Sequence, residues 1–148
     1  MNDNHDITYT DIDDLTLAMI ASEFGETKAG YLRIDDGFAI AAEAGGWPVG
    51  FIGLSWRELP PPLAGVLECF IDIIEVGAAH RRRGIARKLL EITEDRARKL
   101  GAYQIRAWSS EDKIEAIPMW KALGYGLSPG VEHHRDVEVH GFFVSKVL

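Results

Sequence analysis

The sequence predicts one α/β domain built on a mixed sheet with helices on both faces. The chain has 148 residues, of which 47% are hydrophobic, so it can bury one core without covalent staples. Strand and helix patterns follow one another in the order β-α-α-β-β-β-α-β-α-β-β, and their alternation in the second half is typical of a mixed sheet. No internal repeat, low-complexity tract or long linker interrupts this order. We therefore expect residues 1–148 to form a single domain of about seven strands and about four helices.

The first elements are a short strand and two helical segments. Ile7–Thr10 is predicted as a strand, and either Asp11 or Asp13 could cap the helix that follows. The apolar residues of this helix have the spacing of one buried face: Ile12, Leu15, Met19 and Ile20. A second helical segment is expected near Thr27–Ile34.

A hairpin and the longest strand of the chain come next. Gly37–Ala44 and Pro48–Arg57 are predicted as strands, because Gly45-Gly46 between them is typical of a two-residue hairpin turn. Pro60-Pro61-Pro62 excludes regular structure and predicts a surface loop. Val66–Val76 is then predicted as a strand. Apolar residues at its odd-numbered positions indicate one packed face: Leu67, Cys69, Ile71 and Ile73.

The second half alternates helices and strands. Ile85–Leu100 has the apolar period of a helix, and Gly101 ends it. Tyr103–Trp108 is predicted as a strand, and Asp112–Leu123 as a helix that Pro118 interrupts or delays. Two strand patterns complete the chain: Gly126–Glu132 and Val137–Lys146.

The charge of the chain is unevenly distributed. Lys and Arg number 16 against 23 Asp and Glu, a net charge of −7. Residues 1–79 contain 3 basic and 14 acidic residues, whereas residues 80–106 contain 9 basic and 3 acidic residues. A basic island in an acidic protein disfavours general nucleic-acid binding, which needs a broad basic surface. It favours a compact anionic ligand, with a solvated, arginine-rich helix face as the alternative.

Other features of the composition exclude several classes of protein. Cys69 is the single cysteine, so a disulfide framework within the chain and a cysteine-based zinc site are both excluded. No apolar run approaches the roughly 20 residues of a membrane span. The polar, acidic segment Met1–Asp6 does not have the pattern of a signal peptide. We therefore expect a cytoplasmic protein without a membrane partner.

The stretch from Val76 to Ala86 joins the end of the long strand to the start of a long helix. Free N–H groups in the first turn of a helix converge on one spot at the positive end of its dipole. Gly84 and Ala86 are small enough for a ligand to approach that backbone closely, and Arg81–Arg83 add positive charge. This combination predicts a site that binds pyrophosphate without a metal.

Two motifs resemble the GCN5-related N-acetyltransferase (GNAT) family. Arg81-x-x-Gly84-x-Ala86 is similar to the family pattern Arg/Gln-x-x-Gly-x-Gly/Ala at this junction. Ala116-x-Pro118-x-Trp120-x-x-Leu123-Gly124-Tyr125 resembles the second family signature, Ala-x-x-x-Tyr-x-x-x-Gly-Phe. The order of elements also resembles the family fold over essentially the whole chain. The resemblance implies a mostly antiparallel sheet that splays between its fourth and fifth strands, Leu67–Val76 and Tyr103–Trp108.

The resemblance implies that acetyl-CoA is the acetyl donor. Main-chain groups of Ile74, Glu75 and Val76 would pair with the pantetheine arm as an added strand does. Gly77 would permit a bulge there, and the Val76 amide would donate to the thioester oxygen. The groups implied to hold the pyrophosphate come from six consecutive residues: Arg81, Arg82, Arg83, Gly84, Ile85 and Ala86. Lys113 either contacts a phosphate or lies on the surface, and Trp120 would line the pantetheine channel.

The implied reaction is direct attack of a primary amine on the thioester in a ternary complex. The amine must lose its proton, so Asp72 and Glu75 are candidate general bases. Asp72 could instead bind the acceptor or form a structural ion pair. Trp120 stands where the family signature has Tyr, which leaves the general acid to water, to Tyr125 or to no residue. The alternative function is therefore a non-catalytic module that binds or senses CoA.

The identity of the acceptor is suggested only by charge. The acidic remainder of the chain suits a cationic small molecule or a peptide amine. No metal and no nucleic-acid partner is expected, and the resemblance implies that two copies can pair as a homodimer.

Overall fold

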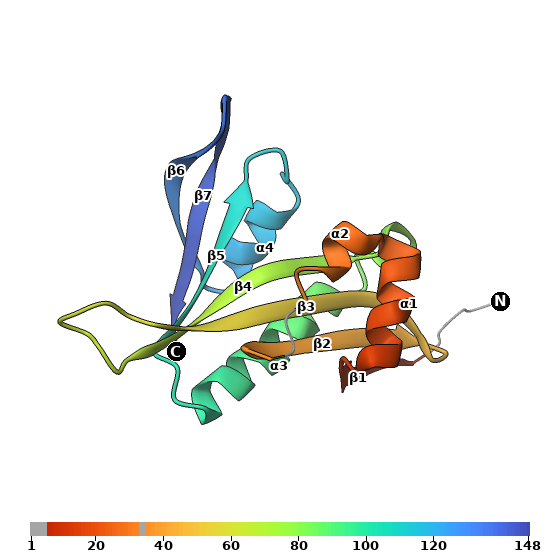
Figure 1. Cartoon of the computed structure of the whole chain (residues 1–148). Helices are drawn as coiled ribbons and strands as arrows, with labels where there is room; N and C mark the ends of the chain where they lie inside the picture. Colours follow the sequence, from red (N-terminus) through yellow and green to blue (C-terminus); the bar gives the residue numbers. More distant parts are fainter. Residues whose placement is uncertain (1–5, 33–34) are drawn as a thin grey trace. The chain divides into compact units, whose positions relative to one another are not determined.

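The computed structural model describes residues 6–32 and 35–148, and within these ranges it contains seven strands and four α-helices. The order of elements is the predicted one, so the α/β class is confirmed (Figure 1). The elements in chain order are β1 (Ile7–Asp11), α1 (Asp14–Phe24), α2 (Glu26–Ala29), β2 (Gly37–Ala44), β3 (Trp47–Glu58), β4 (Leu67–Val76), the 3₁₀ turn η1 (Ala78–His80), α3 (Ile85–Lys99), β5 (Gln104–Ser110), α4 (Ala116–Ala122), β6 (Gly126–His134) and β7 (Val137–Val147).

The strands form one mixed sheet in the order β1-β2-β3-β4-β5-β7-β6. β4 and β5 are parallel, whereas β1–β2, β2–β3, β5–β7 and β6–β7 pair antiparallel. The chain divides into two compact units. Unit 1 comprises the described residues up to Trp56 together with Ile71–Asp95, and unit 2 comprises Arg57–Phe70 and Arg96–Leu148. The splay expected between β4 and β5 concerns residues of both units and stays a prediction.

Unit 1 is built on the β1-β2-β3 meander. Gly45 and Gly46 form its predicted hairpin turn with φ angles of 58° and 81°, as a type I′ turn requires. α1 and α2 cover one face of these strands, where Phe24 packs edge-on against Phe51 at 4.9 Å between ring centroids (Figure 1). The core on this face consists of Ile12, Ile20, Ala29, Leu32, Ala39, Ala41 and Phe51. Gly50, adjacent to Phe51, faces Ile85 of α3, so α3 covers the opposite face.

The buried face of α1 differs from the predicted one. Asp13 is the N-cap, since its Oδ1 accepts a hydrogen bond of 2.8 Å from the Thr16 amide. Thr16 and Ile20 are buried, but Leu15 is 71% exposed. At about 100° per residue, Leu15 lies about 140° around the helix from Ile20. The predicted face therefore included one residue that points into solvent.

Unit 2 contains the N-terminal part of β4, the strands β5, β7 and β6, and α4. α4 begins at Ala116 with Pro118 in its first turn, where a missing backbone N–H costs nothing; the delayed start is thus confirmed. Trp120 and Tyr125 are buried and pack edge to face at 4.9 Å. Lys146 of β7 donates a 2.9 Å hydrogen bond to the Leu123 carbonyl, which joins α4 to the sheet.

Glu68 is a buried carboxylate in unit 2, with a side chain that is 2% exposed. The guanidinium of Arg106 donates two hydrogen bonds to this carboxylate, from Nε to Oε2 at 2.8 Å and from a terminal nitrogen to Oε1 at 2.6 Å. Gln104 donates a third hydrogen bond of 2.7 Å. Burial opposes ionisation of Glu68, but the hydrogen bonds from Arg106 and Gln104 outweigh it and lower its pKa. Hydrogen bonding to Glu68 also raises the pKa of Arg106.

None of the helices formed by residues 6–32 and 35–148 is long and apolar enough to cross a membrane.

The Glu68–Arg106 pair predicts how stability depends on pH. Because folding lowers the pKa of Glu68, its contribution is complete above the ordinary value of 4.5 and is lost as the pH falls through the folded pKa. Denaturant unfolding between pH 7 and pH 3 should therefore show a smaller loss of stability for Glu68→Gln than for wild type. Glu91→Gln, an exposed carboxylate of α3, is the matched control. An unchanged acid limb in Glu68→Gln contradicts the assignment.

At pH 7, Arg106→Leu should destabilise the protein by about 2–3 kcal/mol, because it leaves Glu68 buried without its cation. This figure is set below the range for fully buried pairs because Arg106 is 41% exposed. The double variant Glu68→Gln with Arg106→Leu should recover part of the loss, since a neutral amide needs no counter-charge.

Candidate active site

The junction between β4 and α3 lies entirely in unit 1. β4 ends at Val76, and the Gly77 amide donates a 2.8 Å hydrogen bond to the Val49 carbonyl of β3. The turn η1 and residues 81–84 then lead into α3, whose first turn closes with a 3.0 Å hydrogen bond from the Lys88 amide to the Gly84 carbonyl. The amides of residues 85–87 precede this bond and have no carbonyl four residues back within the helix. They form the donor end of α3.

The turn before α3 adopts an unusual backbone conformation. Arg82 and Gly84 have positive φ angles of 64° and 76°, whereas Arg81 has a φ of −68° and Arg83 is not in the left-handed region. Left-handed residues in a turn can direct neighbouring N–H groups toward one side, as in concave anion sites. A Cβ built on Gly84 would meet no atom within 4 Å, so the space over the turn is open. The exposed turn therefore fits the pyrophosphate that the sequence predicts.

Arg81 and Glu75 form a network beside this turn. Arg81 donates from Nε to the Val76 carbonyl at 3.2 Å, and its guanidinium lies 3.8 Å from Glu75 Oε1. Lys28 of α2 binds the same carboxylate oxygen at 3.2 Å. The structure thus brings together Glu75, Val76 and Arg81 from the predicted set. It also adds Lys28, which no local pattern in the sequence connects to the site.

Asp72 lies on β4 between Ile71 and Ile73, and its surroundings differ from those of Glu75. Its Oδ2 atom is buried and has no hydrogen-bond partner among the described residues. Glu75, in contrast, forms ion pairs with Lys28 and Arg81, and the structural ion pair offered as an alternative role for Asp72 stays a prediction. An uncompensated carboxylate oxygen is an acceptor for an ammonium group or a hydroxyl.

Gly50 of β3 was not predicted as part of the site. A Cβ at this position would lie 3.0 Å from the Glu75 carbonyl, 3.3 Å from Ile85 Cγ2 and 3.4 Å from Val76 Cγ2. The absence of a side chain therefore lets β3, the end of β4 and the start of α3 approach closely. A glycine inside a strand pattern is the only sequence signal for such an approach.

The two other predicted site residues lie in unit 2. Lys113 is exposed in the turn before α4, where its amide donates to the Ser110 carbonyl at 3.1 Å. Trp120 is 3% exposed, and its indole Nε1 is buried without a hydrogen-bond partner among the described residues. Across the described part of the chain, no group of three or more His, Cys, Asp or Glu side chains could hold a metal ion.

The fold and the turn before α3 define a class of protein. The model of the acetyltransferase (GNAT) family matches residues 7–125. The chain therefore belongs to this family, as its two motifs predicted. None of the curated proteins compared with the chain matches it.

Solved structures match the chain over nearly its full length. Arabidopsis thaliana NAA60 in complex with acetyl-CoA has a TM-score of 0.77 at 12% identity, covering 96% of this chain and 99% of that one. Arabidopsis thaliana Naa50 in complex with the bisubstrate analogue CoA-Ac-MVNAL has a TM-score of 0.74 at 16% identity, with coverages of 95% and 97%. The ribosomal-protein-S18-alanine N-acetyltransferase from Escherichia coli also has a TM-score of 0.74 at 16% identity, with coverages of 95% and 93%. At these identities the likeness is one of fold.

Proposed function

We propose that this protein is an acetyl-CoA-dependent N-acetyltransferase that acetylates a primary amine of a small molecule or peptide. The observation that supports the proposal is the exposed turn before α3, where Arg82 and Gly84 have positive φ angles and the first amides of the helix have no carbonyl partner within it. This turn lies at the predicted motif in a chain of the GNAT family. The named structures with acetyl-CoA or a CoA analogue support the choice of donor. We also propose a cytoplasmic location.

The donor would be held chiefly by backbone. The amides of residues 81–86 would bind its pyrophosphate, and the guanidinium groups of Arg81–Arg83 would add charge. Main-chain groups of Ile74, Glu75 and Val76 would pair with the pantetheine arm. Lys113 is proposed to contact a phosphate, and Trp120 to line the channel. Acetyl-CoA supplies an activated acetyl thioester when bound.

Catalysis requires a neutral amine and a donor for the developing negative charge on oxygen. The Val76 amide is proposed as that donor. Asp72 is the better supported of the two candidate bases, because its Oδ2 has no hydrogen-bond partner among the residues that the structure describes, whereas Glu75 is bound by Lys28 and Arg81. Asp72 would accept the proton of the ammonium group, which frees the lone pair of the amine nitrogen to attack the thioester carbon directly in the ternary complex. The C–S bond then breaks, and CoA leaves as a thiolate that takes up the second proton lost by the nitrogen, directly or through water. Glu75 would then position Arg81 at the turn.

A second function is favoured by one observation. Trp120 occupies the position where the family signature has Tyr, and its indole N–H cannot supply an acidic proton to a thiolate. The protein could therefore be a module that binds CoA or acetyl-CoA without catalysis.

Binding of CoA tests the anion site. Gly84→Asp places a negative charge at the turn and should weaken CoA binding about tenfold or more, as loss of a charged hydrogen bond does. Gly101→Asp is the matched control, because Gly101 also has a positive φ and open space around its Cβ but lies at the other end of α3. Asp tolerates this backbone conformation, so both variants should fold. Equal CoA affinities by calorimetry would reject the assignment.

An assay of CoA thiol release with a panel of amines distinguishes an N-acetyltransferase from a module that only binds CoA. Turnover on at least one amine is expected for the wild type, and Asp72→Asn should lower kcat about 100-fold with little change in CoA affinity. Asp14→Asn, an exposed carboxylate at the start of α1, should match the wild type. Tight CoA binding without turnover on any amine supports the module. A kcat for Asp72→Asn equal to that of the wild type removes Asp72 as the base.

A further inference from the structure

Three charged side chains of unit 1 join α2 to the turn before α3. Lys28 of α2 and Arg81 of the turn contact the same atom, Oε1 of Glu75, at 3.2 Å and 3.8 Å. The Glu75 side chain is 19% exposed, against 44% for Lys28 and 52% for Arg81. One partly buried carboxylate oxygen is therefore shared by two cations that come from distant segments of the chain.

The fold fixes Lys28 beside the end of β4. Leu32, shortly after α2, is buried in the core of this face, and Ile73 of β4 packs against the same core. Side chains two positions apart on a strand point to the same side of the sheet, so Glu75 follows Ile73 on the face that α2 covers (Figure 1). Gly53 of β3 makes room for this packing, because a Cβ there would lie 2.9 Å from Leu32 Cδ2. Core packing therefore brings Lys28 to Glu75.

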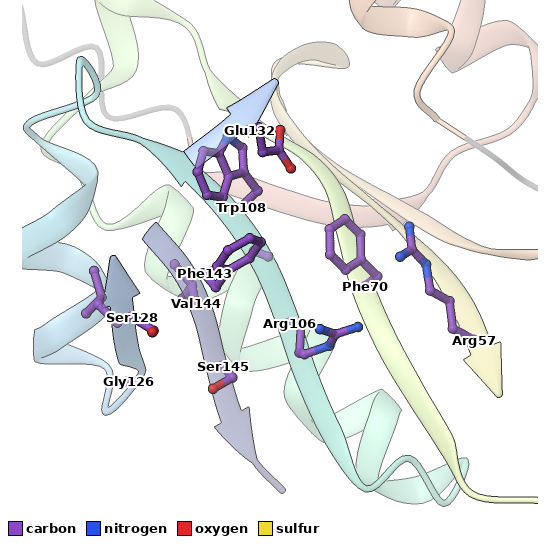
Figure 2. Close-up of a pocket in the computed structure, with 12 residues that line it drawn as sticks. Arg57, Phe70, Arg106, Trp108, Gly126, Ser128, Glu132, Phe143, Val144 and Ser145 are labelled. Atoms are coloured by element: carbon purple, nitrogen blue, oxygen red, sulfur yellow. The ribbon is translucent and has the colours of Figure 1, made fainter. Parts of the chain in front are cut away.

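Arg81 is held loosely when it is compared with Arg106 of unit 2. Arg106 lines a cavity on the face of β5 and β7 (Figure 2), and it donates two hydrogen bonds of 2.8 Å and 2.6 Å to Glu68. Arg81 has a single contact of 3.8 Å to Glu75 and donates from Nε to the Val76 carbonyl at 3.2 Å. A guanidinium has five N–H groups, and these two contacts engage only part of them. The others can bind a phosphate.

Glu75 and a pyrophosphate at the turn compete for Arg81, because both are anions that bind a guanidinium through its N–H groups. The strength of this competition depends on Lys28. With the Lys28 ammonium at 3.2 Å, much of the charge of the Glu75 carboxylate is balanced. Without Lys28, the full charge of Glu75 would act on Arg81 and would also repel the pyrophosphate.

We propose that Lys28 is a positioning residue that sets the affinity of the turn for the pyrophosphate of the donor, acting through Glu75 on Arg81. This inference rests on the proposed function and adds to it a residue of α2 that belongs to neither sequence motif. Lys28 acts without contacting the donor. It balances Glu75, so that Arg81 can direct its remaining N–H groups to the phosphates while Nε stays on the Val76 carbonyl.

The test is a double-variant cycle on the full chain, with CoA affinity measured by calorimetry. Lys28→Met should weaken CoA binding about tenfold, within the range of coupling between neighbouring charged groups. Adding Glu75→Gln should restore most of that affinity, because a neutral amide neither holds Arg81 nor repels the phosphates. In the wild-type background, Glu75→Gln should not strengthen CoA binding, because Lys28 already balances the carboxylate. The sign of the effect of Glu75→Gln thus depends on Lys28.

Two further variants separate positioning from total charge. Lys28→Arg keeps a cation beside Glu75 and should bind CoA nearly as well as the wild type. Lys99→Met removes the same charge from the other end of α3, where the lysine is exposed, and should match the wild type. The Tm of Lys28→Met should stay close to that of the wild type, because exposed ion pairs contribute little to stability. A loss of CoA affinity is then not a loss of folding.

Equal CoA affinities of Lys28→Met and the wild type overturn the proposal. The same conclusion follows if Glu75→Gln strengthens CoA binding by one factor in both backgrounds, as simple removal of a negative charge would. Failure of the proposed function gives a different result. No binding of CoA by the wild type overturns both the donor assignment and the role of Lys28, whereas binding with an additive cycle overturns the role of Lys28 alone.

Discussion

The close approach of β3 to the end of β4 is the constraint on which the candidate active site depends. Gly50 has no side chain where a Cβ would lie 3.0 Å from the Glu75 carbonyl, and the Gly77 amide is bound to the Val49 carbonyl. These contacts fix the point at which β4 ends and the chain turns toward α3. The direction of the free amides at the start of α3 follows from that turn. A larger residue at position 50 would displace the backbone rather than a flexible side chain.

Three arginines of this protein differ in the group that holds the side chain. Arg81 and Arg106 are bound to carboxylates, Glu75 and Glu68 respectively, and these pairs hold local structure. Arg57 instead rests on the ring of Phe70, and its charge helps to lower the pKa of Glu68. The two paired arginines position backbone and strands, whereas Arg57 is held mainly by an aromatic ring. The net charge of −7 does not distinguish these roles, because it sums over both.

Local patterns predicted most of the fold because they reflect interactions within a few residues. Gly45-Gly46 predicted a hairpin, Asp13 was one of two predicted caps, and Pro118 predicted the late start of α4. Leu15 was assigned to the buried side of α1 from its apolar character, although its angle from Ile20 places it in solvent. The two candidate bases of β4, Asp72 and Glu75, could not be told apart, since Lys28, one of the residues that bind Glu75, is distant in sequence.

The sequence by itself determined the family, the order of elements and the position of the turn between β4 and α3, because short stretches of neighbouring residues carry these signals. Only the tertiary structure decided that Glu75 is paired, which side of α1 is buried and which side chains share a face of unit 2. Strand register brings Arg106 beside Ser145 and Trp108 beside Phe143, and Gly130 matters only because the Phe143 ring crosses it. Pairings between distant segments depend on how whole strands align, and no short stretch of sequence contains that information.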